Sequence, residues 1–455
     1  MMSLGEAAAA IGARMQGDDV RFEGVSSDSR SVRRGELFIA IRGEHFDGHA
    51  FLAKAKARGA AAAMVDVRHE GAPPLPTLVV DETRRGLGRL GACWRARFTP
   101  ALIAITGSNG KTTAKEMLAS ILRAHAGEAA VLATLGNLNT DIGVPLTLLR
   151  MRAAHRFCAV ELGMNHPGEV ATLAALARPT MALVTNAQRE HMEFMHTLEA
   201  VAAENASVFD ALPAEGVAVV NADDPQADYF RSAARGRSVV DFGLDARATV
   251  SGGYALRHLS SEIRIQTPAG AVGATLSIPG AHNVRNALAA AACAHAAGVP
   301  PQAIGAGLAA FRPYTGRLQV KQATGGATLI DDSYNANPDS VRAAIDVLAG
   351  TSGRTLLVLG DMGEVGDYGA DFHVEVGRYA REQGVTALFA LGEQTAHSVA
   401  GFGEGARHFA DIKDLVAAAA GAATRGTTLL VKGSRFMQME RAVAALTGAP
   451  TGGGH

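Results

Sequence analysis

A short stretch near residue 110 combines a lysine, hydroxyl side chains and glycines in the pattern of a phosphate-binding loop. The run Thr106-Gly107-Ser108-Asn109-Gly110-Lys111-Thr112-Thr113 directly follows the apolar residues 102–105. Glycines let the backbone close around an anion, and a helix that starts after them points free N–H groups at a phosphate. Lys111 would reach the outer phosphates, and the Thr112 hydroxyl could bind Mg2+. The stretch therefore indicates nucleotide triphosphate chemistry.

The loop departs from the strict form of this pattern at one position. The strict form has a glycine five residues before Gly110, where this chain has Ile105. The stretch is therefore a shortened variant. An ordinary strand, turn and helix remains the alternative interpretation, because short motifs of this kind also arise by chance.

Further polar groups follow the ends of predicted strands. Glu161 ends the apolar run 157–161, and Asn186 and His191 follow the run 182–185. Ligands of parallel sheets bind at the carboxyl ends of strands, so these side chains are candidates for the same site as the loop. Glu161 and His191 could hold Mg2+ beside Thr112, although Mg2+ prefers oxygen ligands and a lone histidine is more often structural.

Buried strands alternate with helical segments from residue 102 onward, which predicts a parallel, doubly wound sheet. Its strands are expected at 102–105, 157–161, 182–185, 217–220 and 239–242. Residues 263–266 and 274–278 alternate between apolar and polar side chains, as half-exposed antiparallel strands do. A later series of strands predicts a Rossmann-like unit, at 328–330, 356–359, 388–391 and 429–432. This unit has no G-x-G-x-x-G motif, so a bound dinucleotide is not implied.

The length of 455 residues suggests three domains of about 150 residues each. We expect them at residues 1–98, 99–313 and 314–455. The predicted fold class is α/β, with a mixed α/β N-terminal domain, a central P-loop ATPase-like domain and a Rossmann-like C-terminal domain. The central domain should contain a mostly parallel sheet and a small antiparallel sheet.

Composition excludes some partners and favours others. Lys and Arg number 43 against 44 Asp and Glu, so no basic field would draw the chain to nucleic acid or anionic lipid, and a small-molecule partner is expected. The cysteines, Cys93, Cys158 and Cys293, are too far apart for a disulfide framework or a zinc site, which indicates a reducing compartment. We find no secretory signal pattern and no apolar stretch of membrane-spanning length, and we expect a soluble, cytoplasmic monomer without membrane insertion.

The first unit contains two polar clusters, at residues 26–30 and 46–49. Residue chemistry alone favours a pair of surface turns. The functional alternative is that Arg30, nearby serine hydroxyls and His49 converge on a phosphorylated or polar ligand.

Taken together, the motifs resemble those of the Mur ligases, the ATP-dependent amide-bond-forming enzymes that build the peptide stem of bacterial peptidoglycan. The resemblance covers essentially the whole chain, and its most specific pieces are residues 106–113, 136–140, 143–147, 161–165, 282–286 and 332–338. The run from Tyr334 to Pro338 is similar to the family branch that adds D-alanyl-D-alanine.

The resemblance implies a three-domain fold, ATP and Mg2+ as cofactors, and two further small-molecule substrates. These are UDP-N-acetylmuramoyl-tripeptide and D-alanyl-D-alanine. The γ-phosphoryl group of ATP would activate the tripeptide carboxylate as an acyl phosphate, and the dipeptide amine would then form the amide, with ADP and phosphate as products.

The resemblance also implies roles for individual residues. The expected catalytic residues are Lys111, Glu161, His191 and Arg317. ATP would be held by residues 107–113, with Asn283 at the adenine, Arg317 at the phosphates and Asp332 at the ribose. Metal ligands would be Thr112, Glu161 and His191. Substrate would contact Ser27, Ser29, Arg30, Asp47, His49, Asn139, Thr140, Tyr334, Asn335 and Asn337.

One position departs from the family. Many Mur ligases carry a lysine, modified to a carbamate that supports the second Mg2+, where alignment places Asn205. An asparagine cannot be carbamoylated, and Glu204 points about 100° away around the helix. We hypothesise that Asn205 contributes an amide oxygen or a water to this metal site.

Three alternatives stay open. The chain could belong to a sibling Mur ligase that adds a single amino acid. It could be a folylpolyglutamate synthase, although residues 28–30 and 46–49 would then have no purpose. A catalytically silent, nucleotide-gated binding protein is the alternative outside enzymes.

Overall fold

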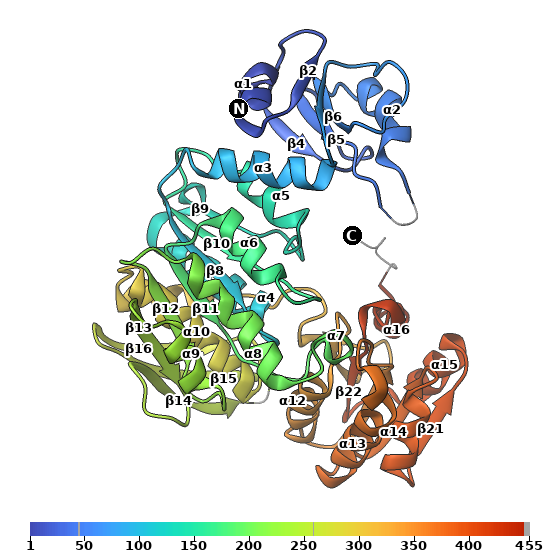
Figure 1. Ribbon diagram of the computed structural model, residues 1–455. Helices are drawn as coiled ribbons and strands as arrows, with labels where there is room; N and C mark the ends of the chain where they lie inside the picture. Colours follow the sequence, from blue (N-terminus) through green and yellow to red (C-terminus); the bar gives the residue numbers. More distant parts are fainter. Residues whose placement is uncertain (44–45, 258, 450–455) are drawn as a thin grey trace.

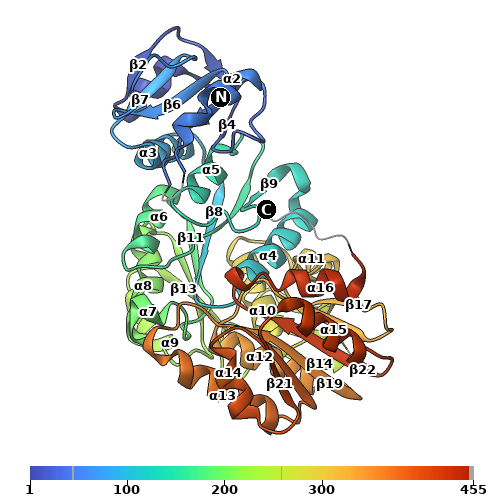
Figure 2. The same ribbon diagram turned by 90° about the vertical axis from the view of Figure 1, so that its right-hand side faces the viewer.

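The computed structural model describes residues 1–43, 46–257 and 259–449, so residues 450–455 of the expected third domain lie outside the described residues. Three main sheets follow one another along the chain, and helices cover their faces (Figure 1). The N-terminal unit lies at one end of the molecule, and the C-terminal unit packs beside the central unit at the other end (Figures 1 and 2). The predicted α/β class is confirmed.

The N-terminal unit is built on a five-stranded sheet in the order β2-β7-β6-β5-β4. Its strands are β2 (Arg14–Gln16), β4 (Gly24–Ser26), β5 (Glu36–Ile39), β6 (Ala62–Asp66) and β7 (Thr77–Val80). A two-stranded ribbon joins β1 (Met2–Ser3) to β3 (Arg21–Phe22). The helical segments are α1 (Leu4–Ile11), η1 (Gly48–Phe51), α2 (Leu52–Ala57) and α3 (Thr83–Arg95). The long α3 lies between this sheet and the central unit (Figure 1).

The central unit contains a nine-stranded sheet in the order β16-β15-β14-β13-β12-β11-β8-β10-β9. Its parallel strands are β8 (Ala101–Thr106), β9 (Val131–Ala133), β10 (Phe157–Glu161), β11 (Met181–Val184), β12 (Val217–Asn221) and β13 (Ser238–Gly243). β14 (Val250–Arg257), β15 (Ser260–Thr267) and β16 (Gly270–Leu276) pair antiparallel with one another, and β14 also pairs in parallel with β13. The predicted antiparallel strands are therefore one end of the same sheet.

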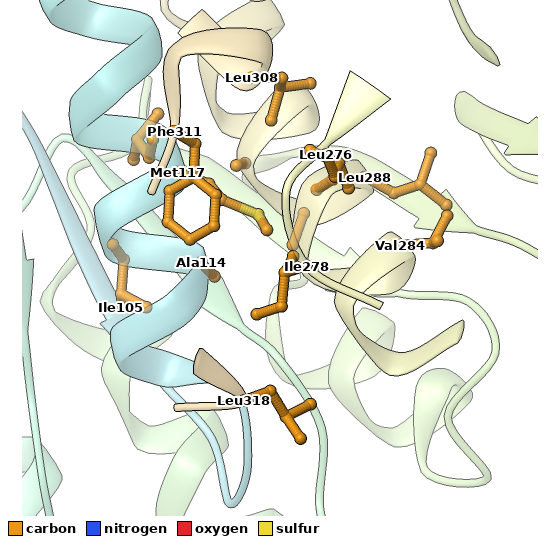
Figure 3. Close-up of a cluster of buried hydrophobic side chains, with 14 of the residues drawn as sticks. Ile105, Ala114, Met117, Leu276, Ile278, Val284, Leu288, Leu308, Phe311 and Leu318 are labelled. Carbon is orange, nitrogen blue, oxygen red and sulfur yellow. The ribbon is translucent and has the colours of Figure 1, made fainter. Parts of the chain in front are cut away.

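The helices of the central unit cover both faces of this sheet. They are α4 (Lys111–Ala126), α5 (Gly143–Leu149), α6 (Glu169–Ala177), α7 (Met192–Met195), α8 (Leu198–Ala206), α9 (Ala227–Ala233), α10 (Ala281–Ala296) and α11 (Pro301–Ala310). Figure 3 shows Ile105 of β8 and Met117 of α4 in one buried cluster with Ile278, Leu288 and Phe311. The strand and the helix that flank residues 107–110, which we call the phosphate loop, are thus both anchored in the core. Their packing fixes the loop between them.

The C-terminal unit has a six-stranded sheet in the order β17-β18-β22-β19-β20-β21, in which only the β17 pairing is antiparallel among the described strands. The strands are β17 (Gln319–Gln322), β18 (Thr328–Asp332), β19 (Arg354–Gly360), β20 (Ala387–Leu391), β21 (Ala406–Phe409) and β22 (Thr427–Lys432). The helices are α12 (Pro338–Ala349), α13 (Gly369–Glu382), α14 (Thr395–Phe402), α15 (Ile412–Ala422) and α16 (Glu440–Thr447). In the part of the chain that the structure describes, we find no helix both long and apolar enough to span a bilayer.

Candidate active site

The phosphate loop between β8 and α4 has a backbone that only glycine tolerates at two positions. Gly107 and Gly110 have φ angles of 126° and 84°. A Cβ atom would lie 2.1 Å from the Thr185 hydroxyl if added at Gly107, and 2.2 Å from Asn286 Oδ1 if added at Gly110. Within the described residues no side chain caps the first turn of α4, so its free N–H groups can serve an anion.

Lys111 folds back across this loop. Its Nζ donates to the backbone oxygens of Gly107 and Ser108, at 2.5 and 2.9 Å. It also lies 3.2 Å from a carboxylate oxygen of Glu190, a residue that the sequence did not single out. Both side chains are largely buried. The ammonium group therefore sits at the loop, where it can meet the phosphates of a nucleotide.

Glu161 is a buried carboxylate with one oxygen unused. It ends β10, and its Oε1 accepts from the Thr112 hydroxyl at 3.1 Å and from Asn139 Nδ2 at 2.9 Å. The side chain is 2% exposed, and Oε2 has no hydrogen-bond partner among the described residues. An unpartnered buried carboxylate oxygen beside a hydroxyl suits a hard cation such as Mg2+.

His191 lies between two carboxylates. Its Nδ1 is 2.6 Å from Glu364 Oε2 of the C-terminal unit, and its Nε2 is 3.7 Å from Glu190 Oε1. The close contact with His191 lowers the pKa of Glu364. Among the described residues there is no group of three or more His, Cys, Asp or Glu placed to hold a metal ion. A cation at Glu161 would thus depend on water and ligand oxygens as well, which is usual for Mg2+.

A cavity of about 1140 Å³ opens between the central and C-terminal units, and most of the expected site residues line it. These are Ser108, Asn109, Gly110, Lys111, Thr112, Thr113, Asn139, Glu161, His191, Asn283, Arg317, Asp332, Tyr334, Asn335 and Asn337. Gly107 and Thr140 are not among its described lining residues. Gly107 supplies a carbonyl to Lys111, and the Thr140 hydroxyl accepts from the Gly143 N–H at the start of α5.

The C-terminal wall of the cavity carries Arg317 and Asp332. The guanidinium of Arg317 stacks 4.2 Å from the centre of the Tyr334 ring, and its Nε has no hydrogen-bond partner among the described residues. Asp332 accepts from the buried Lys432 at 2.6 Å and from the Leu318 N–H at 3.2 Å. Burial lowers the pKa of Lys432 and raises that of Tyr334. Arg317 is therefore available to an anion, whereas Asp332 is held in place.

Two asparagines of the cavity are bound within the protein. Asn283 Nδ2 donates to Pro279 O at 2.7 Å, in the first turn of α10. Asn337 is the N-cap of α12, and its Nδ2 donates to Asn109 Oδ1 at 2.9 Å. This second contact joins the phosphate loop directly to the C-terminal unit.

The structure does not bring the expected N-terminal residues to this cavity. Arg30 forms an exposed ion pair with Asp28, and Ser27 and Ser29 lie in the same turn. Asp47 accepts from His49 Nδ1 at 2.6 Å, and the Nε2 of this histidine accepts from the Asp66 N–H. None of the expected residues Ser27, Ser29, Arg30, Asp47 and His49 appears among the described lining residues. Their roles stay predictions about a separate part of the molecule.

Asn205 is fully buried, and both ends of its amide are used inside the fold. Its Oδ1 accepts from the Thr106 hydroxyl at 2.8 Å, and its Nδ2 donates to Val201 O at 3.0 Å. It is not among the described lining residues of the cavity. The neighbouring Glu204 accepts from the N–H groups of Gly168 and Val170.

We therefore expect Asn205→Ala to act on stability. Loss of the amide leaves the buried Thr106 hydroxyl without its acceptor, at a cost of about 1–3 kcal/mol in the free energy of unfolding. Urea unfolding would measure this cost, with Glu199→Ala on the exposed side of α8 as the control. A variant of normal stability whose activity needed more Mg2+ would instead place Asn205 at the metal.

Sequence reasoning missed several residues of the site. Gln188, Arg189 and Glu190 line the cavity between Asn186 and His191, and Glu364, Lys432 and Arg435 line it from the C-terminal unit. The available signal was position, because the first three lie in a polar stretch directly after a buried strand. Their partners lie up to 186 residues away in sequence, which no local pattern reveals.

Comparisons with known proteins cover all three units. Models of the Mur ligase family match in three parts: a catalytic domain at residues 21–87, the middle domain at 105–294 and the glutamate ligase domain at 316–435. The UDP-N-acetylmuramoyl-tripeptide--D-alanyl-D-alanine ligase of Escherichia coli K12 is 40% identical over 446 residues, which is 96% of each chain.

Solved structures of similar proteins have the same fold as this chain. The crystal structure of MurF from Acinetobacter baumannii superposes with a TM-score of 0.91 at 33% identity and covers 98% of this chain and 99% of its own. MurF ligase from Thermotoga maritima in complex with ADP has a TM-score of 0.82 at 24% identity, covers 94% of this chain and 97% of its own, and supports the fold. The sequence relatives and the family models together place this chain in the Mur ligase family.

Proposed function

We propose that this protein uses ATP to join D-alanyl-D-alanine to the carboxylate of UDP-N-acetylmuramoyl-tripeptide, in peptidoglycan precursor synthesis. One observation carries the proposal: a single cavity unites the phosphate loop of the central unit with the run from Tyr334 to Asn337 in the C-terminal unit. The relative from Escherichia coli has the same activity in its name. Both walls of the cavity come from one chain, which supports a monomeric enzyme, and we place it in the cytoplasm, where ATP is available.

Several residues would hold ATP across the two units. Lys111 and the N–H groups of the loop would bind the phosphates, because the ammonium and the helix end both favour negative charge. Arg317 has an unpartnered buried Nε and would bind phosphate from the opposite wall. Asp332, which Lys432 holds in place, would accept from the ribose hydroxyls. Asn283 would lie on the side of the cavity that receives the adenine of ATP.

The residues present also fit Mg2+. The Thr112 hydroxyl and the unpartnered Glu161 Oε2 would be its protein ligands, with His191 nearby at the same cavity. When bound, Mg2+ neutralises charge on the transferred phosphoryl group. Asn139 donates to the other oxygen of Glu161 and so would keep the carboxylate oriented.

The proposed reaction has two steps. The γ-phosphoryl group passes from ATP to the tripeptide carboxylate, which gives ADP and an acyl phosphate. The amine of D-alanyl-D-alanine then attacks the acyl carbon, phosphate leaves, and a proton is released as the amide forms. Both steps build up negative charge on oxygen, which Lys111 and Arg317 would stabilise. A cavity closed between two units would also protect the acyl phosphate from water.

The three units would divide the substrates. We propose that residues 1–98 hold the UDP-sugar through Ser27, Ser29, Arg30, Asp47 and His49. Residues 99–313 would bind ATP, with Asn139 and Thr140 toward the tripeptide. Residues 314–455 would close over the site, with Tyr334, Asn335 and Asn337 at the dipeptide.

Phosphate release tests this function. With ATP, Mg2+ and UDP-N-acetylmuramoyl-tripeptide present, release should rise strongly on addition of D-alanyl-D-alanine and stay at background with single amino acids. The product should be the UDP-linked pentapeptide by mass. Release that required a single amino acid would assign the chain to a sibling activity, and ATP binding without release under any condition would indicate a silent binding protein.

A further inference from the structure

The segment 186–191, which leaves β11 and leads into α7, contacts two units with alternate residues. Gln188 and Glu190 contact the phosphate loop, whereas Arg189 and His191 contact the C-terminal unit. The chain turns tightly at Arg189, where the Glu190 N–H donates to Gln188 O at 2.8 Å, so neighbouring side chains of this short segment can face different partners. It therefore lies between the loop and the unit that closes the cavity.

The contacts on the loop side are short and reciprocal. Ser108 Oγ donates to Gln188 O at 3.1 Å and accepts from the Gln188 N–H at 2.9 Å. Asn109 Nδ2 donates to Gln188 Oε1 at 2.7 Å. Together with the pair of Glu190 and Lys111, these bonds make the position of the segment depend on the position of the phosphate loop.

On the other side, Arg189 binds two acidic residues of the C-terminal unit at once. Its Nη2 donates to Asp339 Oδ1 at 2.6 Å, its Nη1 donates to Glu375 Oε2 at 2.7 Å, and its backbone N–H donates to Asp339 Oδ2 at 2.9 Å. The guanidinium also lies 5.1 Å from the centre of the Phe372 ring. Asp339 belongs to the first turn of α12 and Glu375 to α13, so one side chain holds two helices.

This contact differs from an ordinary surface ion pair. The side chains of Arg189, Asp339 and Glu375 are 21%, 24% and 22% exposed, so water screens them less than fully exposed charges. The planar guanidinium matches carboxylates geometrically, which a lysine cannot do. Hydrogen bonds from Arg189 lower the pKa of Glu375 to about 2. The clamp, as we call Arg189 with Asp339 and Glu375, therefore persists at neutral pH.

The position of the C-terminal unit matters because the expected reacting groups are divided between the two units. Lys111 lies on the central wall of the cavity, and Arg317 and Tyr334 lie on the C-terminal wall. The clamp is anchored next to Asn337, whose amide pairs with Asn109 of the loop. A change in the clamp thus changes the distance between the walls, and errors of about 1 Å in such positioning can cost a hundredfold in rate.

We propose that Arg189 is a positioning residue, which couples the phosphate loop to closure of the C-terminal unit through the clamp. It would act through Asp339 and Glu375, to which its guanidinium is hydrogen-bonded. The part of this inference that concerns turnover rests on the proposed function, whereas the part that concerns closure does not.

The test compares Arg189→Ala with Arg342→Ala. Arg342 also binds Glu375, at 2.7 Å, but it belongs to α12, so its contact stays within the C-terminal unit. Arg189→Ala should lower kcat by about ten- to a hundredfold while the KM for ATP stays unchanged. Small-angle scattering with a non-hydrolysable ATP analogue should show a larger radius of gyration than for the wild type. Arg342→Ala should match the wild type in the radius of gyration, because its contact with Glu375 does not join the two units.

Arg189→Lys gives the graded comparison. Lysine keeps the positive charge but lacks the planar guanidinium that can bind two carboxylates at once. Both kcat and the radius of gyration should therefore fall between the values of the wild type and of Arg189→Ala. It also keeps the test valid if the alanine variant does not fold, as judged by circular dichroism.

Two results would overturn the inference: an unchanged radius of gyration for both Arg189 variants, or equal effects of Arg342→Ala and Arg189→Ala on the radius of gyration. A higher KM for ATP with an unchanged kcat would also count against the inference, because this result would assign Arg189 to nucleotide binding. If the wild type failed to ligate D-alanyl-D-alanine, the proposed function would fail, and the scattering comparison would still decide the clamp.

Discussion

Replacing Lys111 with alanine should lower ATP-dependent ligation by about a thousandfold or more, because it removes the cation that meets the transferred phosphoryl group. The lysine Nζ is held at the loop by the carbonyls of Gly107 and Ser108, so its charge is already in position before the nucleotide arrives. Phosphate release under saturating substrates would measure the loss, with the exposed Lys413→Ala as the control.

The same substitution should also affect stability, which must be separated from catalysis. Glu190 is only 11% exposed, and without Lys111 it becomes a partly buried charge with its cation removed, at a cost of about 3 kcal/mol. A double variant, Lys111→Ala with Glu190→Gln, should recover most of this stability without recovering ligation. Turnover near the wild-type value in either variant would show that the loop does not bind the reacting phosphates.

Glu161→Gln should lower kcat by about a thousandfold, since a neutral amide binds Mg2+ more weakly than a carboxylate and its NH2 group would take the position of Oε2. The change keeps the shape of the side chain, so Thr112 and Asn139 can still bond to it and the fold should persist. Calorimetry of Mg2+ binding in the presence of an ATP analogue should show a weaker site.

The exposed Glu215→Gln is the matched control for Glu161→Gln. It should leave both kcat and Mg2+ binding at wild-type values. If Glu161→Gln matched this control in Mg2+ binding and in kcat, the metal would have to be held elsewhere, and the unpartnered Oε2 would not be a metal ligand.

Much of the fold was predictable because its signals are local. The apolar strands at 102–105, 157–161, 182–185 and 217–220 are all present in the central sheet, in parallel pairing. The alternation in 263–266 correctly indicated a half-exposed antiparallel strand, since every second residue of β15 is buried. The short β9 and the glycine-containing β14 were missed, because three residues and a weak pattern carry little periodic signal.

The candidate metal site shows that local sequence patterns do not predict which residues a side chain contacts. The resemblance to Mur ligases suggested that Asn205 supports a metal site, and in the structure its amide accepts from the Thr106 hydroxyl at the end of β8. His191 was expected to hold Mg2+ with Glu161, and this stays a prediction: both line the same cavity, and the ring of His191 lies close to Glu190 and to Glu364 of the C-terminal unit. Helical position says which way a side chain points, and only the packing of neighbouring elements decides what it meets.

By itself, the sequence determined the glycine-containing loop after β8, most of the strands of the central sheet, and the family. Glycine spacing, apolar runs and motif order express backbone sterics and burial, and these act over a few residues. The tertiary structure decided which unit faces which. Arg189 meets Asp339 and Glu375, at separations of 150 and 186 residues, because the C-terminal unit packs against the central unit where these charges face one another. Long-range pairing of this kind depends on the whole fold.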